Sequence, residues 1–321
     1  MISVLIPLFN EGMHIAANVD KVHAILDGKN IPHEFVLVDD GSTDSSWDEV
    51  CKLKSKLVCI KAVRLSRNFG KEAAICAGLD QVTSDACVIM DADLQHPPEM
   101  IPEMVRLWRE EGYKVVEGVK ASRGSESMLS KMSAGMFYYS LRKLSGLNLN
   151  GSSDFKLLDR QVVEAWQRME EKNTFFRGMA AWVGFRRKAI PFEVAERKNG
   201  TSKWSVFKLF KLAMNAITSY SSILLQLVTL LGILFLILSI IIGIQTLYMK
   251  FRGIAFSGFT TVILLLLLIG STLMISLGII GIYISRIFDE VKSRPRYIIS
   301  ESLGFNDHIA PSKPDTFTPG T

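Results

Sequence analysis

The sequence predicts an α/β domain with a mostly parallel sheet flanked by helices, followed by two transmembrane helices. Residues 1 to about 120 alternate short apolar runs with longer amphipathic ones, which is the pattern of a parallel sheet covered by helices. Two later runs, 223–249 and 253–285, contain no charged residue. Each run exceeds the roughly 20 residues that a helix needs to cross a bilayer.

The expected elements of the α/β domain alternate regularly along the chain. Each strand candidate is a short apolar run, and each helix candidate is a longer amphipathic stretch between two such runs. We therefore expect strands at 3–7, 35–39, 59–65, 86–90 and 115–119. Helices are expected between them, at 12–26, 45–57, 71–81 and 98–111.

The two long apolar runs predict a helical hairpin in the membrane. Only a short turn around Lys250 and Arg252 separates them, so both chain ends must lie on one side of the bilayer. Seven basic residues flank the hairpin against two in the turn, and an excess of basic residues marks the cytoplasmic side. These seven are Lys203, Lys208, Lys211, Arg286, Lys292, Arg294 and Arg296. We therefore expect a multi-pass protein of the inner (plasma) membrane, with its N-terminal domain and both termini in the cytoplasm.

These patterns divide the chain into four segments. We expect a cytoplasmic domain at 1–202, a juxtamembrane amphipathic segment at 203–222 and the transmembrane hairpin at 223–285. Residues 286–321 are expected to form a cytoplasmic basic segment and a disordered tail, because the last residues are rich in Pro, Thr and Asp.

Composition argues against two classes of function. The net charge of +5 is modest, so nucleic acid is not an expected partner. The GxGxxG motif of dinucleotide-binding dehydrogenases is absent. The four cysteines form no CxxC pair, so we expect buried free thiols in a reducing compartment. They are Cys51, Cys59, Cys76 and Cys87.

The most informative stretch is Asp91-Ala92-Asp93-Leu94-Gln95, directly after the fourth expected strand. Two carboxylates and an amide oxygen at alternate positions can converge on one hard cation. The first and second strands also end in polar clusters, at 7–11 and 39–44. Ligands of open α/β sheets bind at the carboxyl ends of the strands, so the three clusters share the edge where a ligand is expected.

Each cluster also has a purely structural interpretation. Asn10 and Glu11 suit the start of the first helix, and Thr43 or Asp44 suits the N-cap of the second. The two aspartates of the third cluster suit a solvated loop. Their coincidence at one edge of the sheet favours a binding site, in which a cation would neutralise a diphosphate.

Several short motifs, in order along the chain, resemble glycosyltransferase family 2. More narrowly, they resemble its polyprenyl-phosphate branch, which includes bactoprenol glucosyltransferases and dolichol-phosphate mannose synthases. The motifs are 7–11 (PLFNE), 39–44 (DDGSTD), 67–71 (RNFGK), 91–95 (DADLQ), 151–158 (GSSDFKLL) and 196–203 (ERKNGTSK). The apolar hairpin and the segment 294–299 (RPRYII) are similar to the bactoprenol branch, so the resemblance covers residues 1 to about 300.

The resemblance implies a GT-A fold, a nucleotide-sugar donor and a divalent cation, Mg²⁺ or Mn²⁺. Oxygen ligands suit these cations, and Asp91, Asp93 and Gln95 are expected to hold one. The neighbouring His96 is expected to lie in the loop or to pack behind the cation ligands. The residues expected around the nucleotide are Pro7, Phe9, Asn10, Glu11, one of Asp39 or Asp40, Lys71 and Asp91.

The implied acceptor is a polyprenyl phosphate, and it changes the expected chemistry. A sugar hydroxyl needs a general base in order to attack. A phosphate monoester has a second pKa of about 6 and is already ionised near neutral pH. Asp91, Asp93 and Asp154 form the expected catalytic set, and we hypothesise that Asp154 orients substrates or balances charge rather than removing a proton.

The acceptor phosphate also needs cationic partners. The candidates are Lys120, Arg123, Lys131, Arg197, Ser202 and Lys203. Lys120 stands where close family members often carry Arg, which weakens bidentate phosphate binding. Arg197 and Lys203 equally suit a basic flank of the membrane segment. Amphipathic stretches at 128–144 and 204–214 predict helices in the headgroup layer, or else packing against the α/β domain.

Together these expectations describe an inverting enzyme that moves a hexose, glucose or N-acetylglucosamine, from a UDP-sugar to undecaprenyl phosphate. The product would feed glycosylation of a cell-surface polymer. One alternative is a processive polysaccharide synthase, whose usual QxxRW motif is absent, and another is a non-catalytic membrane scaffold, against which the intact acidic set argues. Glycines of the second apolar run would allow close packing in a homo-oligomer; they are Gly270, Gly278 and Gly281.

Overall fold

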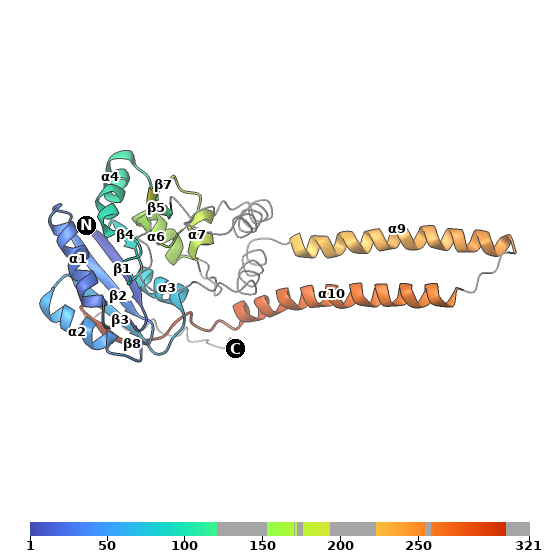
Figure 1. Ribbon diagram of the computed structural model, residues 1–321, viewed down its shortest axis with the longest axis horizontal. Coiled ribbons are helices and arrows are strands. Elements are labelled where there is room, and N and C mark those ends of the chain that lie inside the picture. Colours follow the sequence, from blue (N-terminus) through green and yellow to red (C-terminus); the bar gives the residue numbers. More distant parts are fainter. Residues whose placement is uncertain (121–152, 170, 172–175, 193–222, 254–257, 306–321) are drawn as a thin grey trace, which may run out of the picture. The chain divides into compact units, whose positions relative to one another are not determined.

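The structure is a computed structural model that describes residues 1–120, 153–169, 171, 176–192, 223–253 and 258–305 (Figure 1). These residues fall into two compact units. One contains the described residues up to 192 together with 295–305, and the other contains those from 223 to 294. Each unit is described below by itself.

A sheet of eight strands organises the first unit, in the order β7-β5-β6-β4-β1-β2-β3-β8. Its centre consists of four parallel strands, as the sequence predicts. They are β1 (Ile2–Leu8), β2 (His33–Asp39), β3 (Ile60–Leu65) and β4 (Ala86–Ile89). The mostly parallel α/β fold is therefore confirmed, and the expected bounds of these strands agree to within two residues.

Four outer strands complete the sheet. β5 (Val115–Lys120) is close to the expected run, whereas β6 (Lys156–Asp159), β7 (Arg187–Phe192) and β8 (Ile299–Leu303) were not expected. β6 runs antiparallel to both β4 and β5, β7 is parallel to β5, and β8 is antiparallel to β3. β6 is only four residues long, and β7 and β8 mix charged or polar residues with apolar ones, so they lack the apolar signal of the central strands.

Strand β8 corrects the expected division of the chain. The segment 286–321 was assigned to a cytoplasmic basic segment and a disordered tail, yet Ile299–Leu303 is part of the sheet of the first unit. Glu301 accepts a hydrogen bond from Trp47 Nε1 at 3.0 Å and another from Arg64 Nη1 at 3.0 Å. The chain thus returns from the apolar hairpin to the α/β domain and is fastened there.

Helices cover both faces of the sheet. On one face, α1 (Ile15–Asp27), α2 (Ser46–Lys56) and α4 (Ile101–Glu111) form a single apolar core with the side chains of alternate residues of β1. The opposite face packs against α3 (Lys71–Gln81), where a Cβ added to Gly78 would lie 2.0 Å from Leu5 Cδ1. Because both faces are covered, every residue of β1 is buried.

Three further short helices belong to this unit. They are the 3₁₀ turn η1 (Pro98–Met100) before α4, α6 (Arg160–Gln167) and α7 (Phe176–Trp182). The sequence analysis predicted neither α6 nor α7. α6 buries Val162, Val163 and Trp166 on one face, a short amphipathic signal that the sequence analysis did not use.

Two long helices form the described part of the second unit. α9 (Ile223–Phe251) and α10 (Phe259–Val291) contain candidate membrane spans at Val228–Met249 and Leu268–Val291. Large apolar side chains on both helices are exposed, as expected for surfaces that face lipid. The two candidate spans indicate membrane association, and α10 continues past the expected end at residue 285.

Two glycines with a positive φ provide a test of how closely the loops after β2 and β3 approach each other. Gly41, in the loop after β2, has φ 69°, and a Cβ there would lie 2.4 Å from the carbonyl carbon of Arg67 in the loop after β3. Gly112 has nearly the same φ, 70°, but an added Cβ meets nothing within 4 Å. We expect Gly112→Ala to cost about 1–2 kcal/mol of stability and Gly41→Ala about 1–3 kcal/mol more.

Thermal or denaturant unfolding of the full chain in detergent measures both losses. Gly112→Ala is the matched control, since it carries the same backbone penalty without the contact. Equal destabilisation of the two variants would contradict the close approach of the two loops.

Candidate active site

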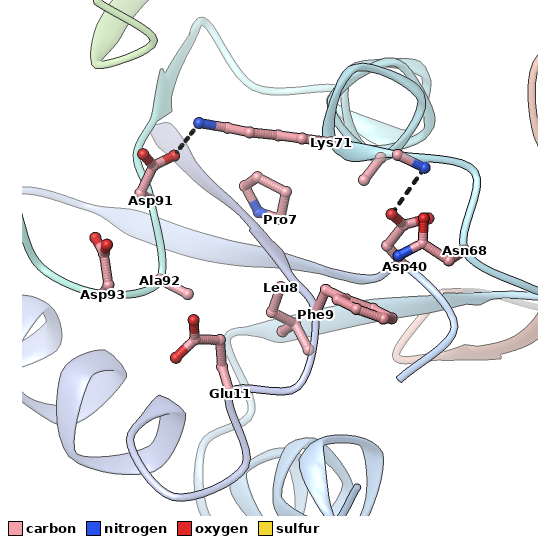
Figure 2. A pocket seen from close by; sticks show the side chains of 12 residues that line it. Pro7, Leu8, Phe9, Glu11, Asp40, Asn68, Lys71, Asp91, Ala92 and Asp93 are labelled. Carbon is pink, nitrogen blue, oxygen red and sulfur yellow. Dashed lines mark hydrogen bonds and ion pairs between the residues drawn. The ribbon is translucent and has the colours of Figure 1, made fainter. Parts of the chain in front are cut away.

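A pocket of about 310 Å³ lies at the carboxyl edge of the central strands (Figure 2). Residues from the ends of β1, β2 and β4 line it, together with the start of α3 and the loop before it. The lining residues are Pro7, Leu8, Phe9, Glu11, Asp40, Asn68, Gly70, Lys71, Ala74, Asp91, Ala92 and Asp93. The three polar clusters that the sequence places at this edge therefore do meet around one pocket.

One wall of the pocket is acidic. Glu11, Asp91 and Asp93 all line it, and their carboxylates are drawn in Figure 2. Burial raises the pKa of Glu11, and the nearby negative charge of Asp93 raises it further. Asp91 Oδ1 is buried, and its described partner is the ammonium of Lys71, 2.6 Å away. Crowded carboxylates of this kind are stabilised by a cation.

The expected cation ligands are only partly brought together. Asp91 and Asp93 line the pocket, whereas Gln95 is not among the lining residues. The described contact of Gln95 is through its backbone, whose N–H donates to Asp93 Oδ1 at 3.1 Å. Leu94 has φ 50°, so the loop leaves the extended conformation in which alternate side chains point the same way. The alternation from which Gln95 was predicted therefore ends before it.

Lys71 joins two carboxylates from different parts of the chain. Its Nζ lies 2.6 Å from Asp91 Oδ1 and 2.7 Å from Asp154 Oδ2. The register of the sheet explains the meeting, because Ile89 at the end of β4 pairs with Lys156 at the start of β6. Burial lowers the pKa of Lys71, but the charges of Asp154 and Asp91 outweigh this effect and raise it. Lys71 is therefore a permanent cation in the pocket.

Arg177 is a functional candidate that the sequence analysis missed. It lies on α7, and its Nε and Nη2 donate to Asp154 Oδ1 and Oδ2 at 2.7 and 3.0 Å. Burial alone would raise the pKa of Asp154, but the hydrogen bonds and charge of Arg177, together with Lys71, hold it well below its usual range. Asp154 is therefore a carboxylate of low proton affinity, which makes it a weak general base.

A neighbouring contact holds the two cations in place. Glu72 follows Lys71 on α3 and accepts a hydrogen bond at 2.7 Å from the N–H of Phe176, the residue before Arg177. This contact ties the start of α3 to the start of α7. Burial raises the pKa of Glu72 to about 7, although the Phe176 N–H opposes the shift.

The two adjacent aspartates at the end of β2 make different contacts. Asp40 lines the pocket and accepts hydrogen bonds from the N–H groups of Phe69 and Gly70 at 2.7 and 2.9 Å. Asp39 is fully buried, accepts from Ser42 N at 3.0 Å and pairs with Arg64 Nε at 3.3 Å. Of the two candidates for nucleotide contact, Asp40 is the one that faces the pocket, and burial raises the pKa of both carboxyls.

Asn10 supports the site from outside the pocket lining. It has φ 58°, and its N–H donates to Ser42 Oγ at 2.9 Å while its Oδ1 accepts from Thr43 N at 3.0 Å. Asp44 Oδ1 accepts from Ser46 N at 3.0 Å, so the cluster after β2 also fastens the start of α2. The N-cap of α2 is Ser45, one residue after the two that the sequence suggested, and Asp44 instead accepts from the first residue of the helix.

His96 lies in the loop between β4 and η1, and its side chain is buried. Its ring stacks on Phe155, with centroids 5.1 Å apart and planes 11° from parallel. Its Nδ1 lies 4.0 Å from Asp91 Oδ2. Burial lowers the pKa of His96, which favours the neutral ring beside the acidic wall. His96 therefore packs behind Asp91.

The side chains of the expected acceptor-phosphate residues all lie outside the part of the chain that the structure describes. Lys120 ends β5, and its side chain lies outside the described residues. The other five also lie outside them; they are Arg123, Lys131, Arg197, Ser202 and Lys203. The same holds for the amphipathic stretches 128–144 and 204–214. These assignments stay predictions.

Comparison with known proteins identifies the family. The sequence model described as glycosyl transferase family 2 matches residues 3–166. "Putative glycosyltransferase CsbB" of Bacillus subtilis (strain 168) is 40% identical over 309 residues, which cover 94% of this chain and 92% of the relative. The SfII prophage-derived bactoprenol glucosyl transferase of Shigella flexneri is 34% identical over 306 residues, or 94% of this chain and 98% of the relative.

A solved structure also matches the domain, at lower similarity. The crystal structure of S. aureus TarS 1–349 in complex with UDP-GlcNAc has a TM-score of 0.48 and 18% sequence identity. The match covers 68% of this chain and 66% of the other.

The half-buried carboxyl of Glu72 gives a test of the site's electrostatics. Its pKa is about 7 in the folded chain against 4.5 for an ordinary glutamate, so the folded state binds the extra proton between these values. Stability therefore falls as the pH rises through this window. Glu72→Gln cannot ionise, so it should not show this fall. Between about pH 5 and pH 8, we expect the free energy of unfolding of the variant to fall by about 1–2 kcal/mol less than that of the unsubstituted protein.

Denaturant unfolding across this pH range, with both proteins in the same detergent, measures the difference. If the two stability curves stay parallel from acid to neutral pH, Glu72 is not the half-buried carboxyl that the structure shows.

Proposed function

Because this chain belongs to glycosyltransferase family 2 and is a GT-A-type glycosyltransferase, we propose that it transfers glucose from UDP-glucose to a polyprenyl phosphate at the membrane surface. The observation that carries the proposal is the pairing of Asp91 and Asp93 on one wall of a pocket at the carboxyl edge of the sheet. The choice of glucose and of the lipid rests on the relatives named bactoprenol glucosyl transferase, one of them 34% identical over 94% of this chain. UDP-N-acetylglucosamine is the second donor to consider.

The proposed donor site uses the opposite sides of the pocket for different parts of the nucleotide. Phe9 lines the pocket and is 42% exposed, so its ring is available to the base. Pro7 and Asp40 line the same region, and Asp40 offers a carboxylate to donors of the base or ribose. Lys71 and the acidic wall then face the diphosphate and sugar.

The residues of the acidic wall fit a divalent cation. Asp91 and Asp93 supply hard oxygen ligands, Asp91 Oδ1 is buried against Lys71, and burial together with the nearby carboxylates raises the pKa of Glu11. Lys71 Nζ contacts that oxygen and balances its charge. Mg²⁺ or Mn²⁺ bound by Asp91 and Asp93 would stabilise the negative charge that develops on the leaving diphosphate.

The proposed reaction needs no proton transfer. An ionised oxygen of the acceptor phosphate forms a bond to the anomeric carbon of the sugar, on the face opposite UDP. The bond from that carbon to the diphosphate oxygen breaks, and its electron pair leaves with UDP, so the configuration inverts. Asp154, already paired with Lys71 and Arg177, holds these two cations near the diphosphate end of the pocket instead of accepting a proton.

The acceptor side of the proposal rests on the second unit and on the basic residues before it. The candidate spans Val228–Met249 and Leu268–Val291 would anchor the enzyme where the lipid phosphate lies. We propose that Lys120, Arg123, Lys131, Arg197, Ser202 and Lys203 bind that phosphate. The basic flanks favour an inner-membrane protein with its catalytic domain and both termini in the cytoplasm. Assembly as a homo-oligomer and use of the product for a cell-surface polymer belong to the same proposal.

Transfer assays test the function directly. The purified full chain is incubated with undecaprenyl phosphate, a divalent cation and a panel of UDP-sugars, and the lipid product is identified by mass. We expect a single hexosyl lipid with UDP-glucose, UDP release that needs the lipid phosphate, and loss of both in EDTA. Products carrying several sugars would indicate a processive synthase, and no metal-dependent release with any donor would indicate a scaffold.

A matched pair of variants tests the acidic wall. Asp93→Asn removes a carboxylate from the pocket, and we expect it to lower kcat/KM by about 100-fold or more. Asp48→Asn removes an exposed carboxylate of α2, away from the pocket lining, and serves as the control. Equal activity of the two variants would contradict the proposed role of the wall.

A further inference from the structure

Three side chains that commonly bind transition metals meet at the opposite edge of the sheet from the pocket. His23 lies on α1, His33 is the first residue of β2, and Cys59 directly precedes β3. One ligand atom from each lies within 4.8 Å of the others. β2 and β3 are parallel, so their first residues share the amino-terminal edge, whereas the pocket is at the carboxyl edge.

The hydrogen bonds of His33 orient it like a metal ligand. Its Nδ1 lies 2.8 Å from Ile31 O, and since a carbonyl oxygen only accepts, Nδ1 carries the hydrogen. Its Nε2 therefore presents a lone pair toward His23, whose Nδ1–H donates to it at 2.8 Å, a hydrogen bond that a metal ion would replace. Metal-binding histidines usually donate their second ring N–H to a carbonyl or carboxylate in this way, which fixes the tautomer.

We propose that His23, His33 and Cys59 form a binding site for Zn²⁺ with solvent as the fourth ligand. Two imidazole nitrogens and a thiolate suit Zn²⁺, and they do not suit the hard Mg²⁺ or Mn²⁺ proposed for the pocket. Zn–N and Zn–S bonds of about 2.1 and 2.3 Å hold the ligand atoms about 3–4 Å apart. The present spacing of the three atoms is already close to this range.

The exposure and the ionisation of the three residues agree with a site at which a metal ion can exchange with solvent. All three residues are partly exposed, so an ion can enter from solvent. Burial lowers the pKa of His33, which keeps its imidazole neutral and able to bind metal. Burial raises the pKa of the Cys59 thiol, so the ion has to displace that proton on binding. Three protein ligands leave one position open.

The site would act on stability and not on transfer. It joins the starts of β2 and β3, which pair in the sheet, to α1, which packs on them through apolar side chains. An ion that binds the folded chain and not the unfolded one shifts the folding equilibrium towards the folded state. The site lies outside the pocket lining, so the inference does not rest on the proposed glycosyl transfer.

Cobalt substitution tests the site. Co²⁺ is titrated into the reduced full chain in detergent, with excess Mg²⁺ present to occupy carboxylate sites. We expect one equivalent to produce a thiolate-to-cobalt charge-transfer band and the intense visible bands of a tetrahedral ion, and Zn²⁺ to abolish both. One equivalent of Zn²⁺ should also raise the Tm by several degrees.

Matched variants separate this site from other thiols. Cys59→Ser should lose the charge-transfer band, whereas Cys51→Ser, which removes a partly exposed thiol of α2, should keep it. His33→Gln should lose the tetrahedral bands, and His23→Gln replaces it as the test if His33→Gln fails to fold. A wild-type protein without the band, or a band that survives Cys59→Ser, would show that the cluster is a hydrogen-bonded histidine pair packed beside Phe35 and not a metal site.

Discussion

The bridge between Lys71 and the carboxylates of Asp91 and Asp154 is the interaction on which the candidate active site depends. Asp91 follows β4, Asp154 precedes β6, and their meeting requires the antiparallel pairing of these two strands. Both carboxylates are partly or largely removed from solvent, so without a cation each would face a desolvation cost. Lys71 therefore neutralises two carboxylates that the pairing of β4 with β6 brings together.

Arg177 makes this balance asymmetric. It forms two hydrogen bonds with Asp154, whereas Asp91 pairs with Lys71 and has the neutral ring of His96 4.0 Å from its other oxygen. Asp154 is thus saturated with positive partners, while Asp91 retains capacity for another cation. This difference separates the roles of two residues that the sequence placed in one catalytic set. Asp91 is suited to a divalent cation, and Asp154 is suited to holding Lys71 and Arg177.

The sequence was sufficient for those parts of the site that follow from a topological rule. The ends of β1, β2 and β4 were found because parallel strands place their carboxyl ends at one edge, and Glu11, Asp40 and Asp93 do line one pocket there. Gln95 was predicted from alternation along an extended chain, and the positive φ of Leu94 breaks that alternation. Arg177 was missed because a lone arginine on a short helix carries no periodic signal, and its contact with Asp154 is made only in the folded chain. Likewise, nothing in 299–303 indicates that it pairs with β3 across more than two hundred residues.

The central claim is that Asp154 organises charge and does not accept a proton, and the pH–rate profile of Asp154→Asn tests it most directly. The account predicts a lower rate with the same pH dependence as the unsubstituted enzyme, governed by ionisation of the acceptor phosphate near its second pKa of about 6. A near-total loss of rate that recovers as the pH rises, as when hydroxide replaces a missing base, would contradict it.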